Sequence, residues 1–212
     1  MESKFISKVF KWMFIGLLIT FATAYVTATT QSILNFVFGT GFFYVLIIGE
    51  LVIVTVLAAR VNKMEPTTAK LLFCAYSIVS GLTFSSIFVL YEMASIVFLF
   101  MVAALVFGLF AFVGSVTKID LTRFSTIIMM SLFGIVILAI INIFLNSPTL
   151  DLFLSWVGLI LFMGITAYDM QKLKAYASIG TDNLAILGAL DLYLDFINIF
   201  IKLLNLFGKR RD

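Results

Sequence analysis

The chain alternates between long runs of apolar residues and short groups of charged residues, prolines and asparagines. Seven apolar runs are long enough to form helices that cross the hydrocarbon core of a bilayer, which takes about 20 residues per helix. The connections between them are short, and both prolines, Pro66 and Pro148, fall in connections. The predicted spans are 12–28, 42–60, 69–91, 95–116, 125–145, 152–169 and 183–206. We therefore expect an all-α, polytopic membrane protein, in which residues 1–212 form a single integral-membrane domain built as a seven-helix bundle.

The composition supports this class and excludes several chemistries. Hydrophobic residues make up 63% of the chain and charged residues 12%, against roughly half and a quarter in soluble domains. The absence of histidine excludes Ser-His and Cys-His catalysis and any His-ligated metal. Cys74 is the one cysteine, so the chain forms no internal disulfide. Any response to pH near neutrality must therefore come from carboxyl groups in unusual surroundings.

Basic residues predict how the bundle is oriented. Ten of them lie before the first span or in or beside the second, fourth and sixth connections, which share one side of the membrane: Lys4, Lys8, Lys11, Arg60, Lys63, Lys70, Lys118, Arg123, Lys172 and Lys174. The first, third and fifth connections contain no Lys or Arg. Because cytoplasmic loops carry the excess of basic residues, we expect a cytoplasmic N-terminus.

The last four basic residues, Lys202, Lys209, Arg210 and Arg211, do not follow this pattern, because an odd number of spans would place the C-terminal tail outside. Either the last segment is a half-span that returns to the cytoplasm, or it crosses fully and the tail is an exception. We expect a full crossing. The tail from Lys209 to Arg211 is a candidate for contact with anionic headgroups or a partner.

The last span carries a stripe of polar residues. They are spaced 4, 3, 4 and 3 residues apart, which places them on one face of a helix: Asp191, Asp195, Asn198, Lys202 and Asn205. Such a stripe cannot face lipid, so we expect this helix at the centre of the bundle, with the other six wrapped around it. In the alternative interpretation, Asp195 and Lys202 only neutralise each other and hold helices together.

Other charges within the predicted spans are few. Glu50 lies eight residues into the second span, about 12 Å deep at 1.5 Å per residue. Arg60 ends that span, and Asp169 ends the sixth span in the stretch AYDMQKLK. By position alone, Asp169 is as readily an ordinary interfacial residue beside Lys172 as a functional one.

Small residues recur at every fourth position in two spans. Ser77, Gly81 and Ser85 do so in the third span, and Ala104 and Gly108 in the fourth. This spacing predicts close approach of neighbouring helices rather than chemistry.

The stretches AYDMQ (167–171) and LDLYLDFINIFIKLL (190–204) resemble the Bax inhibitor-1 family of membrane proteins. The resemblance covers essentially the whole chain. Bacterial members resemble pH-sensitive calcium leak channels, so the resemblance implies a place in a bacterial plasma membrane. It also implies a C-terminal helix at the centre of six others, in agreement with the polar stripe.

The resemblance further implies site residues. Asp169 and Asp195 correspond to a pair of aspartates that acts as pH sensor and gate, Arg60 corresponds to an arginine that can engage Asp169, and Glu50 matches an acid of the second span more loosely. Asp169 lies near the membrane surface, and along the predicted last helix Asp191 is closer to that depth than Asp195. Position therefore favours Asp191 as the partner of Asp169, whereas the resemblance favours Asp195.

The chemistry of such a gate follows from electrostatics. Two carboxylates a few ångströms apart in a water-poor setting cannot both ionise cheaply, so we expect the pair to share one proton when the path is closed. Loss of that proton would replace a hydrogen bond by repulsion and let Arg60 compete for Asp169. Glu50, Asp191 and Asn198 would line the ion path, with transient calcium contacts at Asp195 and Asp191, because Ca²⁺ prefers carboxylate oxygen.

We expect no enzyme and no resident cofactor, with calcium ions and protons as the transported species and the lipid bilayer as the surrounding partner. Intramembrane aspartyl proteases carry Gly-x-Gly-Asp followed by Pro-Ala-Leu, whereas this chain has Gly188-Ala189-Leu190-Asp191 and no proline after Pro148. Nothing indicates nucleic-acid binding. Two alternatives stay open: a non-transporting membrane interaction protein that regulates a membrane protease or a stress pathway, and a calcium/proton exchanger.

Overall fold

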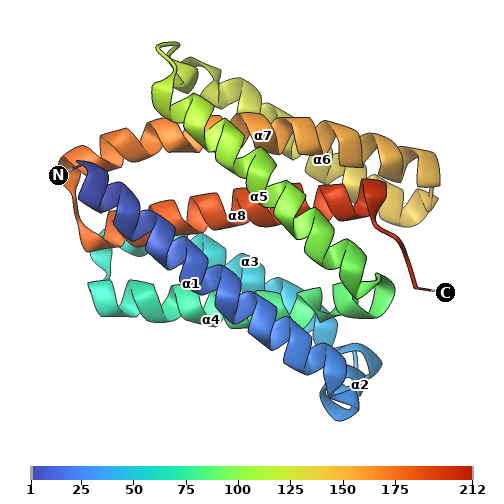
Figure 1. The fold of residues 1–212 in the computed structure, drawn as a ribbon. Coiled ribbons are helices and arrows are strands. Elements are labelled where there is room, and N and C mark those ends of the chain that lie inside the picture. The colour runs from blue at the N-terminus through green and yellow to red at the C-terminus, as the bar shows by residue number, and fades with distance from the viewer. Residues whose placement is uncertain (1, 212) are drawn as a thin grey trace. The chain divides into compact units, whose positions relative to one another are not determined.

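The computed structural model describes residues 2–211, which form helices joined by short connections (Figure 1). This range contains no β-strand, although an isolated antiparallel bridge joins Tyr91 to Arg210. Seven of its helices are long and apolar enough to cross a membrane. They are α1 (Glu2–Thr29), α3 (Phe42–Arg60), α4 (Pro66–Leu90), α5 (Met93–Val116), α6 (Ser125–Leu145), α7 (Pro148–Ile179) and α8 (Asp182–Phe207). The predicted class, an all-α polytopic membrane protein, is confirmed.

The predicted spans 42–60 and 125–145 coincide with α3 and α6, and the largest difference concerns α7. This helix continues ten residues beyond Asp169, to Ile179. The residues after Asp169 are less apolar but none of them ends a helix. Gly180 does so, with φ of +71° and its N–H donated to the carbonyl of Tyr176 at 2.9 Å. The helix therefore extends beyond the predicted end of the sixth span, because the sequence becomes less apolar before the helix ends. The prediction that the span itself ends at Asp169 stays a prediction.

A short helix, α2 (Gln31–Gly39), lies in the first connection and was not predicted. Its sequence, QSILNFVFG, mixes polar and apolar residues over nine positions, about 13 Å of helix, which is less than half of the hydrocarbon core. Gly41, with φ of +77°, turns the chain into α3. Two single 3₁₀ turns, η1 (Val61–Lys63) and η2 (Leu121–Phe124), precede α4 and α6.

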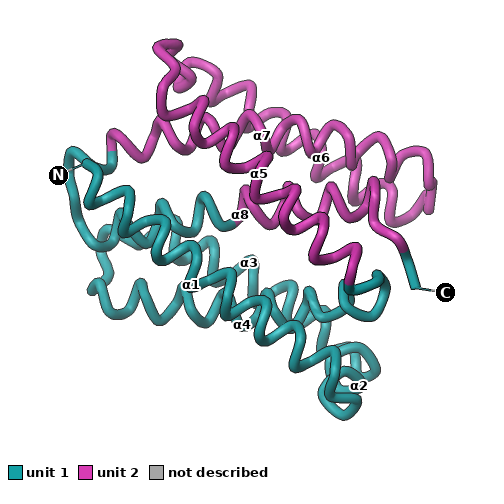
Figure 2. The backbone as a smooth tube through the Cα atoms, viewed as in Figure 1, with its two compact units in different colours: residues 1–93, 176–193, 210–212 teal, residues 94–175, 194–209 magenta. Residues whose placement is uncertain are grey.

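The helices pack as two compact units (Figure 2). Unit 1 comprises residues 1–93, 176–193 and 210–212, and unit 2 comprises residues 94–175 and 194–209. The helices α7 and α8 each contribute to both units. The single membrane domain and the central position of α8 stay predictions.

In unit 1, α1 lies along α4 (Figure 1). A Cβ atom added at Gly81 would lie 2.6 Å from the Cβ of Thr23 and 2.7 Å from the carbonyl oxygen of Thr20, so the two helices approach closely there. Ser77 and Ser85 are buried on the same helix. The close packing predicted from the small residues of the third span is confirmed.

In unit 2, α5 and α7 meet even more closely. A Cβ atom added at Gly114 would lie 2.1 Å from the carbonyl oxygen of Ala167. The prediction for Ala104 and Gly108 is wrong, because both are exposed and no atom lies within 4 Å of a Cβ added at Gly108. The small residues of the buried face have another register: the face consists of Ile96, Leu99, Ala103, Phe107, Ala111 and Gly114.

Aromatic rings connect α5 to the second half of α8 in unit 2. Phe100 meets Phe196 and Phe200 with ring centroids 5.0 Å and 5.7 Å apart, and Phe107 lies 5.8 Å from Phe196. All three contacts are edge-to-face, the arrangement that aromatic quadrupoles favour. The α8 segment that follows Asp195 is therefore packed against the aromatic rings of α5.

Candidate functional site

The polar stripe of α8 becomes less buried toward its C-terminal end. Asp195 is 2% exposed, its stripe neighbours Asp191, Asn198 and Lys202 are half-buried, and Asn205 is exposed. In the apolar 18-residue stretch of α8, 78% of the residues are buried, against 6% in α6. The middle of the stripe is thus shielded from lipid, as the sequence predicted, while its last member is not.

Asp169 is also buried, at 7% exposure, in the middle of α7. Its Oδ1 lies 3.7 Å from the Nζ of Lys172, one turn further along the helix. The ordinary pairing with Lys172 is therefore present, but it is long and involves a carboxyl group that is nearly inaccessible. Asp169 is not the surface residue that its place at the end of an apolar run suggested.

Two contacts in unit 2 fix the register between α7 and α8. The rings of Trp156 and Phe207 lie 5.7 Å apart. A Cβ atom added at Gly158 would lie 2.8 Å from Cε of Lys202, whose stem crosses the glycine. As residue numbers rise along α7 they fall along α8, so these segments run antiparallel.

This register brings the faces that carry the two aspartates toward each other. Asp169 lies 11 residues after Gly158, about three turns, and Asp195 lies seven residues before Lys202, about two turns. Each aspartate therefore shares a helix face with the residue that makes the contact. Along the helices the aspartates are about 16 Å and about 10 Å from that contact, in the same direction. Helical side chains lean toward their own N-terminus, which narrows the remaining offset in an antiparallel pair.

Lys202 has a partner other than Asp195. Besides its packing on Gly158, it is attracted electrostatically by Asp151 near the start of α7. Asp151 also accepts a hydrogen bond from Nδ2 of Asn142. The alternative in which Lys202 neutralises Asp195 gains no support from these contacts.

Glu50 lies in unit 1, half-buried on α3. Its Oε1 is 2.8 Å from the hydroxyl of Thr83, and that hydroxyl is also 2.9 Å from the carbonyl oxygen of Ser80. A hydroxyl has one proton to donate. Thr83 can donate to an ionised Glu50, or it can donate to the Ser80 carbonyl and accept from a protonated Glu50. Both charge states of Glu50 therefore find a hydrogen bond at this position.

A second set of hydroxyl groups lies in the interior of unit 1, and sequence analysis missed it. The hydroxyl of Tyr193, a fully buried residue of α8, lies 2.7 Å from the hydroxyl of Thr20, which donates to the carbonyl of Ser77 at 2.9 Å. The ring of Tyr76 lies 5.8 Å from that of Tyr193. The 4 and 3 spacing of Tyr76, Ser80 and Thr83 could have indicated a polar face on α4, but it does not predict the pairing of Tyr193 with Thr20.

The start of α8 is anchored within unit 1 by two adjacent side chains. Asp182 forms ion pairs with Lys8 and, at 3.2 Å, with Lys70. Asn183 donates through Nδ2 to the carbonyl oxygens of Val61 and Met64, each at 2.7 Å. These contacts hold the first turn of α8 against α1, α4 and the end of η1.

The chain that follows α8 contacts the opposite end of unit 1. The backbone N–H of Arg211 donates to the carbonyl of Leu90 at 2.9 Å, at the last residue of α4. The start of α8 contacts Lys70, near the first residue of α4. In unit 1 the C-terminal residues therefore lie at the end of α4 away from the N-terminal lysines, which favours the expected full crossing by α8.

The other predicted site residues, Arg60 and Asn198, have surroundings of their own. Arg60 is the last residue of α3, in unit 1, with an exposed side chain. Asn198 donates through Nδ2 to the carbonyl of Leu194 on its own helix at 2.8 Å. Among residues 2–211, no group of three or more carboxylate or thiol side chains is arranged to hold a metal ion. The engagement of Asp169 by Arg60 and the transient calcium contacts at Asp191 and Asp195 stay predictions.

Seven apolar helices with buried carboxyl groups define a multi-pass helical membrane protein. The chain belongs to the Bax inhibitor-1 family, because the family model described as "Inhibitor of apoptosis-promoting Bax1" matches residues 2–212. It is 41% identical over 215 residues to the inner membrane protein YbhL of Escherichia coli, covering 98% of this chain and 92% of that protein. A protein of Borreliella burgdorferi is 37% identical, with 100% and 94% coverage, and a membrane protein of Streptococcus pyogenes is 33% identical, with 76% and 71% coverage.

Proposed function

We propose that the protein is a pH-sensitive calcium leak channel, gated by Asp169 on α7 and Asp195 on α8. It acts without enzymatic chemistry or a resident cofactor, in a bacterial plasma membrane, with its N-terminus in the cytoplasm. The observation that carries the proposal is the helical register in unit 2, which turns the faces of two buried aspartates toward each other.

The closed state holds one proton between the two carboxyl groups. A shared proton forms a hydrogen bond between helices and leaves one negative charge to be buried instead of two, which lowers the cost of burial. Removal of the proton creates two like charges in a water-poor interior and pushes α7 and α8 apart. Arg60 then competes for Asp169 and stabilises the open state.

The close contacts of α7 make such a switch discrete rather than gradual. Near Asp169, Ala167 lies directly against Gly114 of α5, and about two and a half turns before Ala167, Gly158 lies against Lys202 of α8. A helix held by close contacts of this kind cannot slide by small amounts, so repulsion between the carboxylates shifts it between distinct packed arrangements.

The ion path is lined by Glu50, Asp191 and Asn198. Carboxylate oxygens attract divalent cations and repel anions, and transient contacts with Asp191 and Asp195 would lower the barrier for Ca²⁺ without trapping it. The hydroxyl of Thr83 beside Glu50 supports this role, because it provides a hydrogen bond whether or not the carboxyl group carries a proton.

Calcium flux into liposomes tests the proposal. Purified protein should pass more Ca²⁺ at pH 8 than at pH 6, because the shared proton closes the path. Asp169→Asn and Asp195→Asn should each abolish the difference between the two pH values. Asp151→Asn is the matched control, since it makes the same charge change at an exposed position of α7 and should keep the wild-type pH profile. An unchanged profile in both gate variants would end the gating proposal.

A second candidate function is a non-transporting interaction protein, which the family description favours because it names an inhibitor of apoptosis-promoting Bax1. In this case the aspartates are structural and the bundle acts by binding another membrane protein that controls a membrane protease or a stress pathway. Liposomes that contain the protein would then pass no Ca²⁺ at either pH. A calcium/proton exchanger is distinguished in the same vesicles, because an inward calcium gradient would drive protons outward.

A further inference from the structure

A groove lies in unit 1 between the short helix α2 and the last turns of α4. It has a volume of about 430 Å³, which falls within the range of small-molecule sites, about 300 to 1,000 Å³. Its walls are mostly apolar, with one amide and one hydroxyl among them. The lining residues are Leu34, Asn35, Phe38, Gly39, Ser86, Val89 and Leu90.

The C-terminal tail lies at the rim of this groove, through Arg211, with Arg210 next to it in the chain. The backbone N–H of Arg211 donates to the carbonyl of Leu90, which itself lines the groove, and Nη1 of Arg211 donates to the carbonyl of Phe88 at 3.2 Å. Arg210 forms the antiparallel bridge with Tyr91. A guanidinium group has five N–H donors, and the contact with Phe88 involves one nitrogen of the Arg211 guanidinium, Nη1. Glu92 is the acidic side chain of the same connection.

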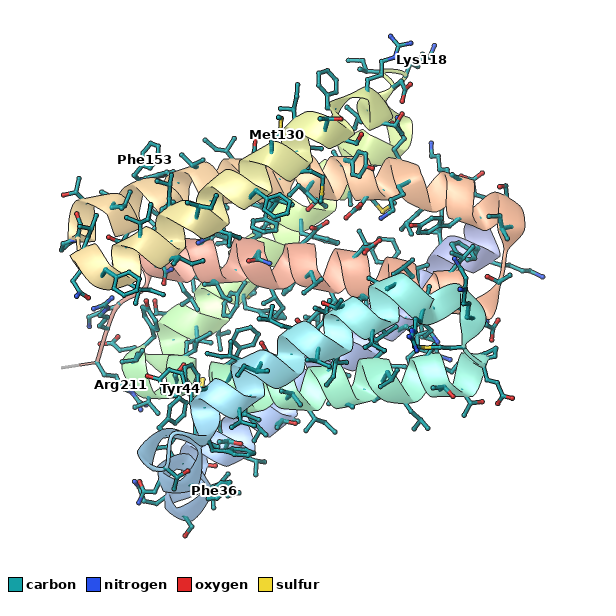
Figure 3. The ribbon with its side chains drawn as sticks, turned by 180° about the vertical axis from the view of Figure 1, so that it is seen from behind. Phe36, Tyr44, Lys118, Met130, Phe153 and Arg211 are labelled. Atoms are coloured by element: carbon teal, nitrogen blue, oxygen red, sulfur yellow. The ribbon has the colours of Figure 1, made fainter. Side chains whose placement is uncertain are left out.

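This end of unit 1 has features that are typical of a membrane–water boundary. The nine residues of α2 are too few to cross the bilayer and carry polar side chains on one side, as helices that lie in the interface do. Tyr44 is 70% exposed at the start of α3, and Phe36 of the preceding helix α2 is 52% exposed (Figure 3). Tyrosine is enriched at the headgroup level. The groove therefore opens where acyl chains meet phosphate groups.

We propose that this groove is a binding site for one anionic phospholipid. An acyl chain fills the apolar walls between α2 and α4, and the phosphate accepts hydrogen bonds from Arg210 and Arg211. Arginine suits this role because its planar donors match phosphate geometry in pairs. A zwitterionic lipid would place a cationic group beside the same arginines, so the site selects for negative charge. The proposal does not depend on the gate or on calcium transport.

Quenching of a single tryptophan by brominated lipids tests this site. Trp12 and Trp156 are replaced by phenylalanine, and Phe38→Trp places the one fluorophore in the groove wall. Bilayers contain either phosphatidylglycerol or phosphatidylcholine with brominated acyl chains, at equal mole fraction in an unlabelled background. We expect several-fold stronger quenching by the brominated phosphatidylglycerol, because its anionic headgroup is attracted by the basic side chains of the tail. Leu34→Trp, on the same wall, repeats the measurement if Phe38→Trp does not fold.

The double variant R210Q/R211Q should remove the preference while leaving quenching by phosphatidylcholine unchanged. The double variant K118Q/R123Q is the matched control, because it removes two exposed basic residues from the connection after α5 and should keep the preference. Equal quenching by the two lipids in the parent protein would overturn the proposal, as would a preference that survives R210Q/R211Q.

Discussion

The buried acids of the two units have different surroundings. Glu50 of unit 1 is next to the hydroxyl of Thr83 and interacts electrostatically with Tyr193, whose hydroxyl pairs with that of Thr20. Asp195 of unit 2 belongs to a helix segment that packs through Phe196 and Phe200 against rings of α5. Hydroxyl groups can stabilise an ionised carboxylate, so a constant hydrogen-bonding role is expected for Glu50 in unit 1. Proton exchange linked to movement is expected in unit 2, where the proposed gate has two carboxyl groups.

The same difference extends to what holds the helices together. In unit 1, polar side chains form hydrogen bonds between helices, at the start of α8 and between the hydroxyls of Tyr193 and Thr20. In unit 2, the helices are held by the contact of Gly114 with the backbone of α7 and by packing of aromatic rings. Substitutions in unit 2 should therefore act through steric overlap, and those in unit 1 through lost hydrogen bonds. Four stability predictions sharpen this contrast.

Gly114→Ala should have the largest effect. The new methyl group would overlap the backbone of Ala167, which cannot rotate away, so we expect a loss of about 3 kcal/mol in the free energy of unfolding, at the upper end for overpacking. Gly108→Ala on the same helix meets no atom within 4 Å and should be neutral or slightly stabilising. Unfolding in mixed detergent micelles, followed by circular dichroism, compares the two. Equal stability of both variants would contradict the close α5–α7 contact.

Asn183→Ala should have the next largest effect. It removes the donor that serves two backbone carbonyls, of Val61 and Met64, in a buried setting, so we expect a loss of about 1 to 3 kcal/mol. Asn205→Ala, at an exposed position of the same helix, is the control and should change stability little. The same unfolding measurement applies, and an effect no larger than that of the control would show that the start of α8 is not anchored here.

Tyr193→Phe should cost about 1 kcal/mol, because it removes a buried hydroxyl but keeps the ring. A double-mutant cycle with Thr20→Val should give a coupling energy of about 0.6 kcal/mol, the average for hydrogen bonds between membrane helices. Tyr44→Phe, at an exposed position, serves as control. Additive effects of the two substitutions would mean that the hydroxyl pair does not join α1 to α8.

Asp182→Asn should have the smallest effect, below about 1 kcal/mol, because its ion pairs with Lys8 and Lys70 are partly exposed to water. The effect should shrink as salt is added, since exposed charges are screened. Unfolding at low and at high ionic strength checks this. A loss that is large and independent of salt would mean that Asp182 acts through buried hydrogen bonds instead.

Much of the fold could be predicted from hydropathy, and the failures have physical causes. Apolar runs locate spans because each span must bury about 20 residues in hydrocarbon. Apolar runs do not locate the ends of helices that continue beyond the apolar run. The end of α7 at Ile179, ten residues after Asp169, was therefore not predicted. The short helix α2 lacked a run long enough to be noticed, and Gly108 showed that a small residue at the right spacing can still be on the wrong face.

The candidate site was only partly predictable. The spacing of charged residues in the last span placed Asp195 on a common face with its polar neighbours, and burial agrees with that. The proposed pairing of Asp169 with Asp195 depends on the register between two helices, which is set by Gly158 and the stem of Lys202. No pattern within one helix contains that information. The hydroxyl pair of Tyr193 and Thr20 was missed for the same reason.

The central claim, that Asp169 and Asp195 exchange one proton as a pair, is tested most directly by infrared difference spectra of the purified protein between pH 6 and pH 8. We predict a protonated-carboxyl band that is lost at the higher pH and is absent from both Asp169→Asn and Asp195→Asn, because neither residue holds the proton alone. Glu50→Gln and Asp151→Asn should keep the band. If each gate variant removed only its own independent band and left the other unchanged, the shared-proton gate would be contradicted.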